Sequence, residues 1–198
     1  MTRLSAVFVL ACVVTAAPAD QLLMMPTARR LPPGLFRAEV WTNRQLAAGT
    51  VTAGLGQAWD AQISLDRFGF DPGRPTGALS YYYLTPIADL TPGIGGGILD
   101  VANATTDGRR LYACATMNRS IPKLNRYGYA ELTAGFELGR RPGPMAGLRV
   151  PAARNVSVLG EYDGFRFNFG AEGKFGGGVY ARLAARGGVG YVVIGFRS

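Results

Sequence analysis

Short segments in which apolar and polar side chains alternate recur along the whole chain. In "YGYAELTAGFEL", Leu132 and Phe136 share one face, and Glu131 and Glu137 share the other. Successive side chains of a β-strand point to opposite faces of the sheet, so this period of two predicts strands with one apolar and one polar face. Turn-forming stretches such as "DPGRPTG" and "GRRPGPM" separate the segments. The predicted strands are 34–43, 49–58, 59–67, 77–86, 93–102, 109–118, 127–138, 145–151, 155–162, 164–173, 177–186 and 188–197.

A soluble antiparallel sandwich and a membrane barrel both show this alternation. Three features favour the barrel. The predicted strands cluster around 9 or 10 residues, and strands of about 9–11 residues cross a bilayer when tilted. Full charges such as Glu131, Arg166 and Arg182 lie within strands, where a wet lumen tolerates them and a sandwich core does not. Aromatic residues, Trp41 and Trp59 among them, lie near strand ends, as in interfacial girdles. The sequence therefore predicts an all-β, antiparallel up-and-down transmembrane barrel of about 10–12 strands.

The first residues predict export. "MTRLSAVFVLACVVTAAPAD" carries a positive charge at Arg3, a short apolar run and a small-residue site at Ala17-Pro18-Ala19, which is the pattern of a cleaved secretory signal peptide over residues 1–19. A lipoprotein signal with Cys12 as the lipidated residue is the alternative. Residues 20–33, "DQLLMMPTARRLPP", are irregular and bounded by proline, and we expect an extended N-terminal arm there, followed by the barrel over 34–198. The expected location is the bacterial outer membrane.

The composition excludes much of enzyme chemistry. The chain has no histidine, so the commonest general base and the commonest metal ligand are missing. After signal cleavage Cys114 is the sole cysteine, which rules out an internal disulfide. The net charge of +8 comes almost wholly from scattered arginines, and export argues against nucleic acid as the partner. We expect a protein without enzymatic activity, cofactor or metal.

The expected partners are outer-membrane lipid, the barrel assembly machinery and, as a candidate ligand, an anionic polysaccharide. Many outer-membrane barrels end on an aromatic residue that the assembly machinery reads. Here Phe196 is followed by Arg197 and Ser198, so that signal is displaced by two residues.

Charges of both signs fall on the polar faces of the predicted strands. They are expected either to form an interior network that plugs a narrow barrel or to make a polar track for an anionic polysaccharide. The predicted lumen network consists of Arg37, Glu39, Glu131, Glu161, Arg166, Glu172, Arg182 and Arg186.

The stretch "EYDG" predicts a tight hairpin formed by Glu161, Tyr162, Asp163 and Gly164. An Asp-Gly pair between two alternating runs is typical of a two-residue type I′ turn, which needs positive φ. Glu161 and Asp163 could also serve as a carboxylate pair for glycoside chemistry. We favour the interpretation in which Asp163 forms the turn and Glu161 pairs with Arg166 or another arginine.

Two stretches resemble outer-membrane β-barrels of the YjbH type, a family associated with exopolysaccharide production and export. They are "LLMMPTARRLPPGLFRAEV" (22–40), with its short "PTA" element, and "VSVLGEYDGFRFNFGAEG" (156–173). The residues that match the second motif are Glu161, Tyr162, Asp163, Gly164, Asn168 and Gly170. Members of the family are usually longer, so nearly all of the mature chain would correspond to one barrel-forming unit.

The resemblance implies a non-enzymatic accessory role in exopolysaccharide production, export or surface organisation. A narrow porin or a purely structural outer-membrane barrel is the first alternative. A soluble periplasmic sandwich that binds carbohydrate is the second. A lipid-modifying outer-membrane enzyme is disfavoured because such hydrolases commonly use histidine, although a mechanism based on Ser, Asp or Glu stays open.

Overall fold

The computed structural model describes residues 22–23, 25–43, 46–68, 74–105 and 107–198. The predicted signal peptide lies outside the described residues. In the part of the chain that the structure describes, twelve strands follow one another, with one 3-10 turn at Asn125–Tyr127. The strands are β1 (Phe36–Thr42), β2 (Leu46–Gly54), β3 (Trp59–Phe68), β4 (Arg74–Leu84), β5 (Gly93–Leu99), β6 (Arg110–Arg119), β7 (Ala130–Leu138), β8 (Gly143–Ala153), β9 (Val156–Tyr162), β10 (Phe167–Lys174), β11 (Val179–Arg186) and β12 (Val189–Arg197).

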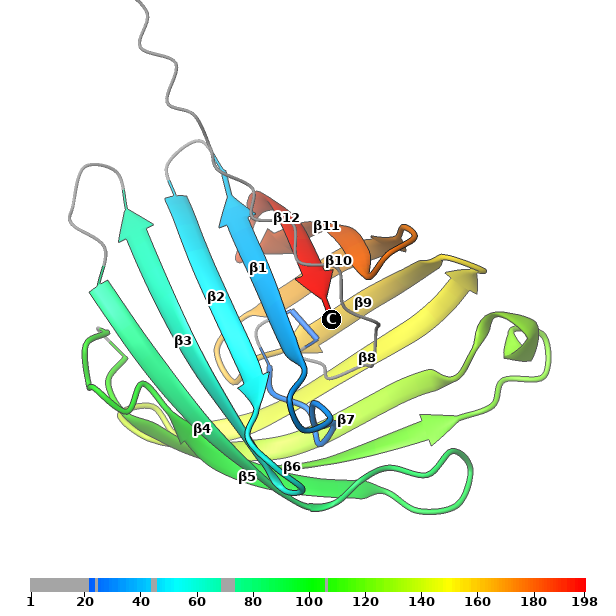
Figure 1. Cartoon of the computed structure of the whole chain (residues 1–198), viewed down its shortest axis with the longest axis horizontal. Coiled ribbons are helices and arrows are strands. Elements are labelled where there is room, and N and C mark those ends of the chain that lie inside the picture. The colour runs from blue at the N-terminus through cyan, green and yellow to red at the C-terminus, as the bar shows by residue number, and fades with distance from the viewer. Residues whose placement is uncertain (1–21, 24, 44–45, 69–73, 106) are drawn as a thin grey trace, which may run out of the picture.

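Each strand pairs antiparallel with its neighbours in sequence, and the pairing of β1 with β12 closes the sheet into a barrel (Figure 1). In the closing pair, Arg37 lies opposite Arg197 and Thr42 lies opposite Val192. Closure pairs the main-chain groups of every strand, as a bilayer requires. The prediction of an all-β, antiparallel up-and-down barrel is confirmed, and the sandwich alternative is wrong.

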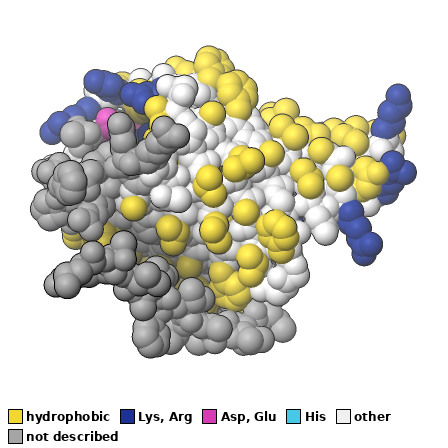
Figure 2. All heavy atoms as spheres, turned by 90° about the horizontal axis from the view of Figure 1, so that it is seen from above, with side chains coloured by type: hydrophobic (Ala, Val, Ile, Leu, Met, Phe, Trp, Pro, Cys, Tyr) yellow, Lys and Arg dark blue, Asp and Glu magenta, His cyan; other side chains and the backbone are white. Residues whose placement is uncertain are grey.

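The two faces of the sheet are the reverse of those in a soluble protein. The outward side chains include Ile63, Phe167 and Leu183, which are 69%, 67% and 67% exposed, whereas Glu131 and Arg182 on the inner face are 1% exposed. Figure 2 shows apolar side chains spread over the outer surface, with Lys and Arg at its two ends. An apolar band outside and charges inside are what a lipid-facing barrel needs.

Among the residues that the structure describes, no helix is long and apolar enough to cross a membrane.

The two tryptophans lie on opposite faces of the sheet. Trp59 is exposed at the start of β3, and its ring lies 4.8 Å from that of Tyr81 on β4, in the position predicted for an interfacial aromatic. Trp41 is only 8% exposed and points into the lumen, so its assignment to the outer girdle is wrong. The parity of β1 decides this, because Trp41 shares a face with Arg37 and Glu39.

The segment before β1 lies inside the barrel (Figure 1). We call residues 22–33 the plug segment, of which all but residue 24 are described. It is irregular, as predicted, but it does not extend away from the barrel, because Leu22, Leu23, Met25 and Leu31 are at most 1% exposed. Leu22, Leu23 and Met25 pack with inward side chains of the wall into one apolar cluster, whose wall members include Trp41, Tyr112, Cys114, Met145, Leu159 and Val193. The prediction of an N-terminal arm missed this burial.

Hydrogen bonds of a buried carboxylate order the loop between β5 and β6. Asp100 accepts hydrogen bonds from the backbone N–H groups of Ala104 and Thr105, at 2.8 and 2.7 Å, and from the Thr105 hydroxyl at 2.6 Å. Burial raises the pKa of Asp100, but these hydrogen bonds outweigh it and hold the pKa below its ordinary value. The stabilisation is therefore present above the ordinary carboxyl pKa and is lost as the pH falls through the lowered value.

Candidate functional site in the barrel lumen

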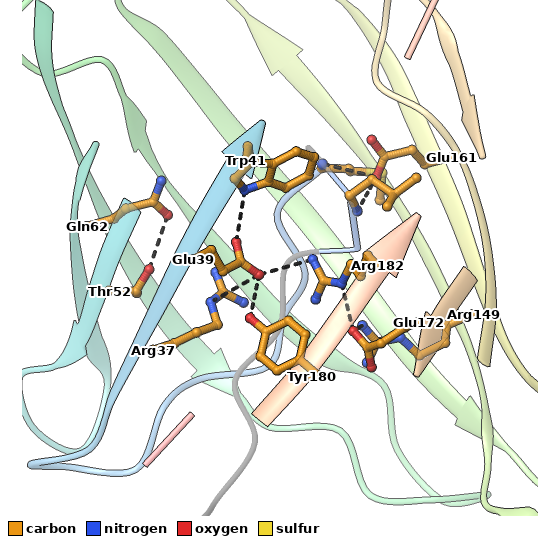
Figure 3. A network of polar contacts seen from close by, with 12 residues as sticks. Arg37, Glu39, Trp41, Thr52, Gln62, Arg149, Glu161, Glu172, Tyr180 and Arg182 are labelled. Carbon is orange, nitrogen blue, oxygen red and sulfur yellow. Dashed lines mark hydrogen bonds and ion pairs between the residues drawn. The ribbon is translucent and has the colours of Figure 1, made fainter. Parts of the chain in front are cut away.

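A charge network crosses the lumen from β1 to β10 (Figure 3). At its centre is Arg182 on β11, whose Nη1 lies 3.1 Å from Glu39 Oε1 and whose Nε donates to Glu172 Oε2 at 2.7 Å. All three side chains are at most 1% exposed. Buried charges are costly unless they are paired, and this guanidinium pairs with two carboxylates at once.

Further groups surround Glu39. The Tyr180 hydroxyl donates to Glu39 Oε1 at 2.5 Å, and the Trp41 indole N–H donates to Glu39 Oε2 at 3.4 Å (Figure 3). Arg37 Nε lies 4.0 Å from Glu39 Oε1. At the other end of the network, Arg149 Nη2 lies 3.7 Å from Glu172 Oε2. The network thus holds three arginines against two carboxylates, in contact with a phenol and an indole.

Strand register explains why these residues meet. Glu172 lies directly opposite Arg182 in the β10–β11 ladder, the geometry in which opposite charges pair across strands. Gly195 lies opposite both Glu39 and Tyr180 in the ladders of β12. A Cβ at Gly195 would come 2.2 Å from the Tyr180 ring, so only glycine leaves the space through which the phenol reaches Glu39.

A second group of lumen side chains binds the main chain of the plug segment. Glu161 Oε2 on β9 accepts the backbone N–H of Leu23 at 2.8 Å and that of Met25 at 3.2 Å. Its other oxygen accepts the Asn168 side-chain amide at 2.9 Å. The predicted partner of Glu161 was an arginine, whereas the structure places backbone amides of the plug segment there.

The same kind of contact recurs on other strands of the wall. Thr116 Oγ1 on β6 accepts the backbone N–H of Ala28 at 2.7 Å. Asp60 Oδ2 on β3 accepts the backbone N–H of Leu31 at 3.0 Å. Polar side chains of three strands therefore accept four backbone N–H groups of the plug segment, and buried amides require such partners.

One side chain of the plug segment forms an ion pair with the wall. Arg29 Nη1 lies 2.6 Å from Glu131 Oε2 on β7. Beside it is a cavity of about 30 Å³, whose lining includes Pro26, Arg37 and Tyr82. A water molecule needs roughly 10–15 Å³ of such space, so the cavity is large enough for water.

The hairpin at 163–166 has a four-residue loop between β9 and β10. Asp163 Oδ1 accepts the backbone N–H groups of Phe165 and Arg166 at 3.0 and 2.8 Å, which makes an Asx-type turn. Gly164 has φ +92°, but Asp163 is not among the described residues with positive φ. The prediction of a two-residue type I′ turn is therefore wrong.

The same contacts weigh against glycoside chemistry. Asp163 serves the turn and lies 3.8 Å from Arg186 Nε, while Glu161 holds the plug segment. Tyr162, the remaining hairpin residue, donates to the Gly164 carbonyl at 3.0 Å. Neither carboxylate is arranged around an open site for a sugar, as such a pair requires.

Most of the predicted charge network faces the lumen. Arg37, Glu39, Glu172 and Arg182 meet in one cluster, Glu131 and Glu161 bind the plug segment, and Arg186 lies at the rim beside Asp163. Arg166 is the exception. It is exposed in the β9–β10 loop, because β10 begins at Phe167, after the residue. The prediction that Arg166 belongs to the lumen network is therefore wrong.

The sequence analysis also missed residues of the barrel wall that contact the charge network or the plug segment. Arg149, Asp60, Thr116 and Tyr180 all contact the network or the plug segment. Parity within the predicted strands could have found Arg149, which alternates with Leu148 and Val150. Nothing local in the sequence marks Thr116 or Asp60 as partners of the plug segment.

The fold and the lumen together define the class of this protein: a closed antiparallel β-barrel with an apolar outer face, whose interior holds the segment that precedes β1. No family model matches the chain, and no curated protein sequence matches it significantly. Among solved structures, the chain is similar to the N-terminal β-barrel domain of Pseudomonas aeruginosa OprF. The match has 14% identity, covers 85% of this chain and 100% of that one, and has a TM-score of 0.28.

Proposed function

We propose that this chain is a non-enzymatic β-barrel of the bacterial outer membrane, held closed by its plug segment. The observation that carries the proposal is the filled lumen. Four apolar side chains of the segment are at most 1% exposed within the barrel, and its amides bind side chains of three strands. Such an interior supports a narrow or purely structural barrel over a wide aqueous channel.

The chemistry of the lumen supports a role without catalysis. Glu39, Glu161 and Glu172 are each engaged by an arginine, a phenol or backbone amides of the plug segment. A general acid or base needs access to a substrate proton, and these carboxylates are buried against the protein itself.

Conductance separates the closed barrel from the narrow porin. The purified protein is inserted into planar lipid bilayers and the current is recorded under a fixed voltage. We expect no stepwise current above that of bilayers with detergent alone, because the plug segment lies in the lumen and its apolar side chains pack against the wall. Uniform, reproducible conductance steps from the unmodified protein would contradict closure and favour the porin.

We further propose an accessory role in exopolysaccharide production, export or surface organisation. The support is the resemblance to YjbH-type barrels. Two of the motif residues, Glu161 and Asn168, hydrogen-bond to each other in the lumen, and Asp163 and Gly164 form the turn. With a closed lumen, that role concerns the barrel surface and not passage of a polymer through it.

Deleting the gene tests this role. We expect the deletion strain to lose a measurable share of its cell-bound or secreted exopolysaccharide, and the wild-type chain to restore it in trans. The amounts are measured as acid-hydrolysed sugar per cell under conditions in which the polymer is made. Unchanged amounts and unchanged distribution would favour the purely structural barrel.

A further inference from the structure

We infer that the lumen is a binding site for an irregular, bent peptide, and that the plug segment is its ligand in cis. Three observations carry the inference: side chains of the wall bind the main chain of the segment, recesses at glycines hold its side chains, and an exposed turn connects it to β1. The occupancy of this site does not depend on the envelope role proposed above.

Main-chain recognition comes first. Glu161, Thr116 and Asp60 lie on β9, β6 and β3, and together they accept four backbone N–H groups of the plug segment. Every non-proline residue carries such an N–H, so these bonds fix the path and the direction of the peptide and leave its sequence open.

Side-chain recognition adds specificity. A Cβ at Gly147 would come 2.2 Å from Leu22 Cδ1, and a Cβ at Gly170 would come 3.1 Å from Leu23 Cδ2. The two glycines thus form recesses for the two leucines. Together with the ion pair of Arg29, they define the ligand as a peptide with two adjacent bulky apolar residues and a basic residue further along.

The junction with β1 separates the ligand from its receptor. Pro33 and Gly34 are exposed, and Gly34 has φ +79°, so the chain turns there before it enters β1. The contacts that hold the segment are made by residues before this turn. Cutting the chain at the turn therefore removes the covalent link and leaves those contacts in place.

The experiment inserts a protease recognition sequence between Pro33 and Gly34 of the full-length chain. The folded protein is cut in detergent, passed through a gel-filtration column and analysed by mass spectrometry, with the mobility of unheated protein in gels reporting the fold. We expect the cut segment to stay with the barrel and to exchange with an added fluorescent peptide of residues 20–33. Immediate loss of the segment from a barrel that stays folded, or collapse of the barrel on cutting, would overturn the inference.

Two comparisons test recognition. Thr116→Val removes the hydroxyl that binds Ala28, and we expect it to speed release of the cut segment by about tenfold, the equivalent of one hydrogen bond. Thr42→Val, at an exposed position at the end of β1, is the matched control and should leave the rate unchanged.

A peptide of the same composition in scrambled order should fail to exchange. Equal exchange by the scrambled peptide, or equal release rates for the two variants, would show unspecific filling of an apolar cavity.

Discussion

Replacing Arg182 with leucine is expected to lower the free energy of unfolding by about 3–5 kcal/mol, because it leaves two buried carboxylates with only the longer contacts to Arg37 and Arg149, at 4.0 and 3.7 Å. Arg182 is the cation between Glu39 and Glu172, at 3.1 and 2.7 Å, and its side chain is 0% exposed. The loss is measured as the shift of the urea midpoint in detergent micelles. Tryptophan fluorescence follows the transition, since Trp41 lies against Glu39.

A variant that keeps the cation is the control for this result. Arg182→Lys retains a positive charge between Glu39 and Glu172. We expect the lysine variant to lose less stability than the leucine variant, because its ammonium group still pairs with the two buried carboxylates. A loss below about 1 kcal/mol for Arg182→Leu alone would contradict the buried network, since that is the value of a solvent-screened pair.

Gly54→Ala is expected to displace the end of the plug segment. A Cβ at position 54 would come 2.4 Å from the carbonyl oxygen of Pro32 and 2.8 Å from that of Leu31. These are backbone atoms and cannot move aside as a side-chain tip can. The overpacking should cost about 1–3 kcal/mol and weaken the hydrogen bond from Leu31 N–H to Asp60.

Trypsin measures that displacement directly, because Arg29 and Arg30 lie within the segment and are only partly exposed. We expect Gly54→Ala to be cut there faster than the wild type. Gly49→Ala on the same strand is the matched control, since a Cβ at position 49 meets nothing within 4 Å. Equal cutting of the two variants would show that the segment does not rest against β2.

The plug segment is bound too tightly to leave the lumen spontaneously by thermal motion. Burying a leucine or methionine completely contributes about 1.5–3 kcal/mol, and four apolar side chains of the segment are buried in this way. The main-chain hydrogen bonds add to that. A spontaneous open state would therefore be too rare to carry measurable current, which agrees with the closed barrel proposed above.

The sequence by itself determined the strands, their faces and the class of fold. Alternation with a period of two is a local property, and it survives in the finished barrel because each strand keeps one side to lipid and one side to the lumen. The same parity identified Arg37, Glu39, Glu172 and Arg182 as inward residues before any pairing was known. It failed at Arg166, where the Asx turn lengthens the loop and ends the alternation before β10.

Only the tertiary structure decided what fills the lumen. Residues 22–33 have no periodicity, because their path follows acceptors on strands far away in sequence, such as Thr116 and Glu161. Those partners come together only when β12 returns to β1 and closes the barrel. Pairing across a closed sheet depends on the whole chain and not on any local pattern. The sequence therefore predicted an extended N-terminal arm over residues 20–33, whereas the structure buries the plug segment.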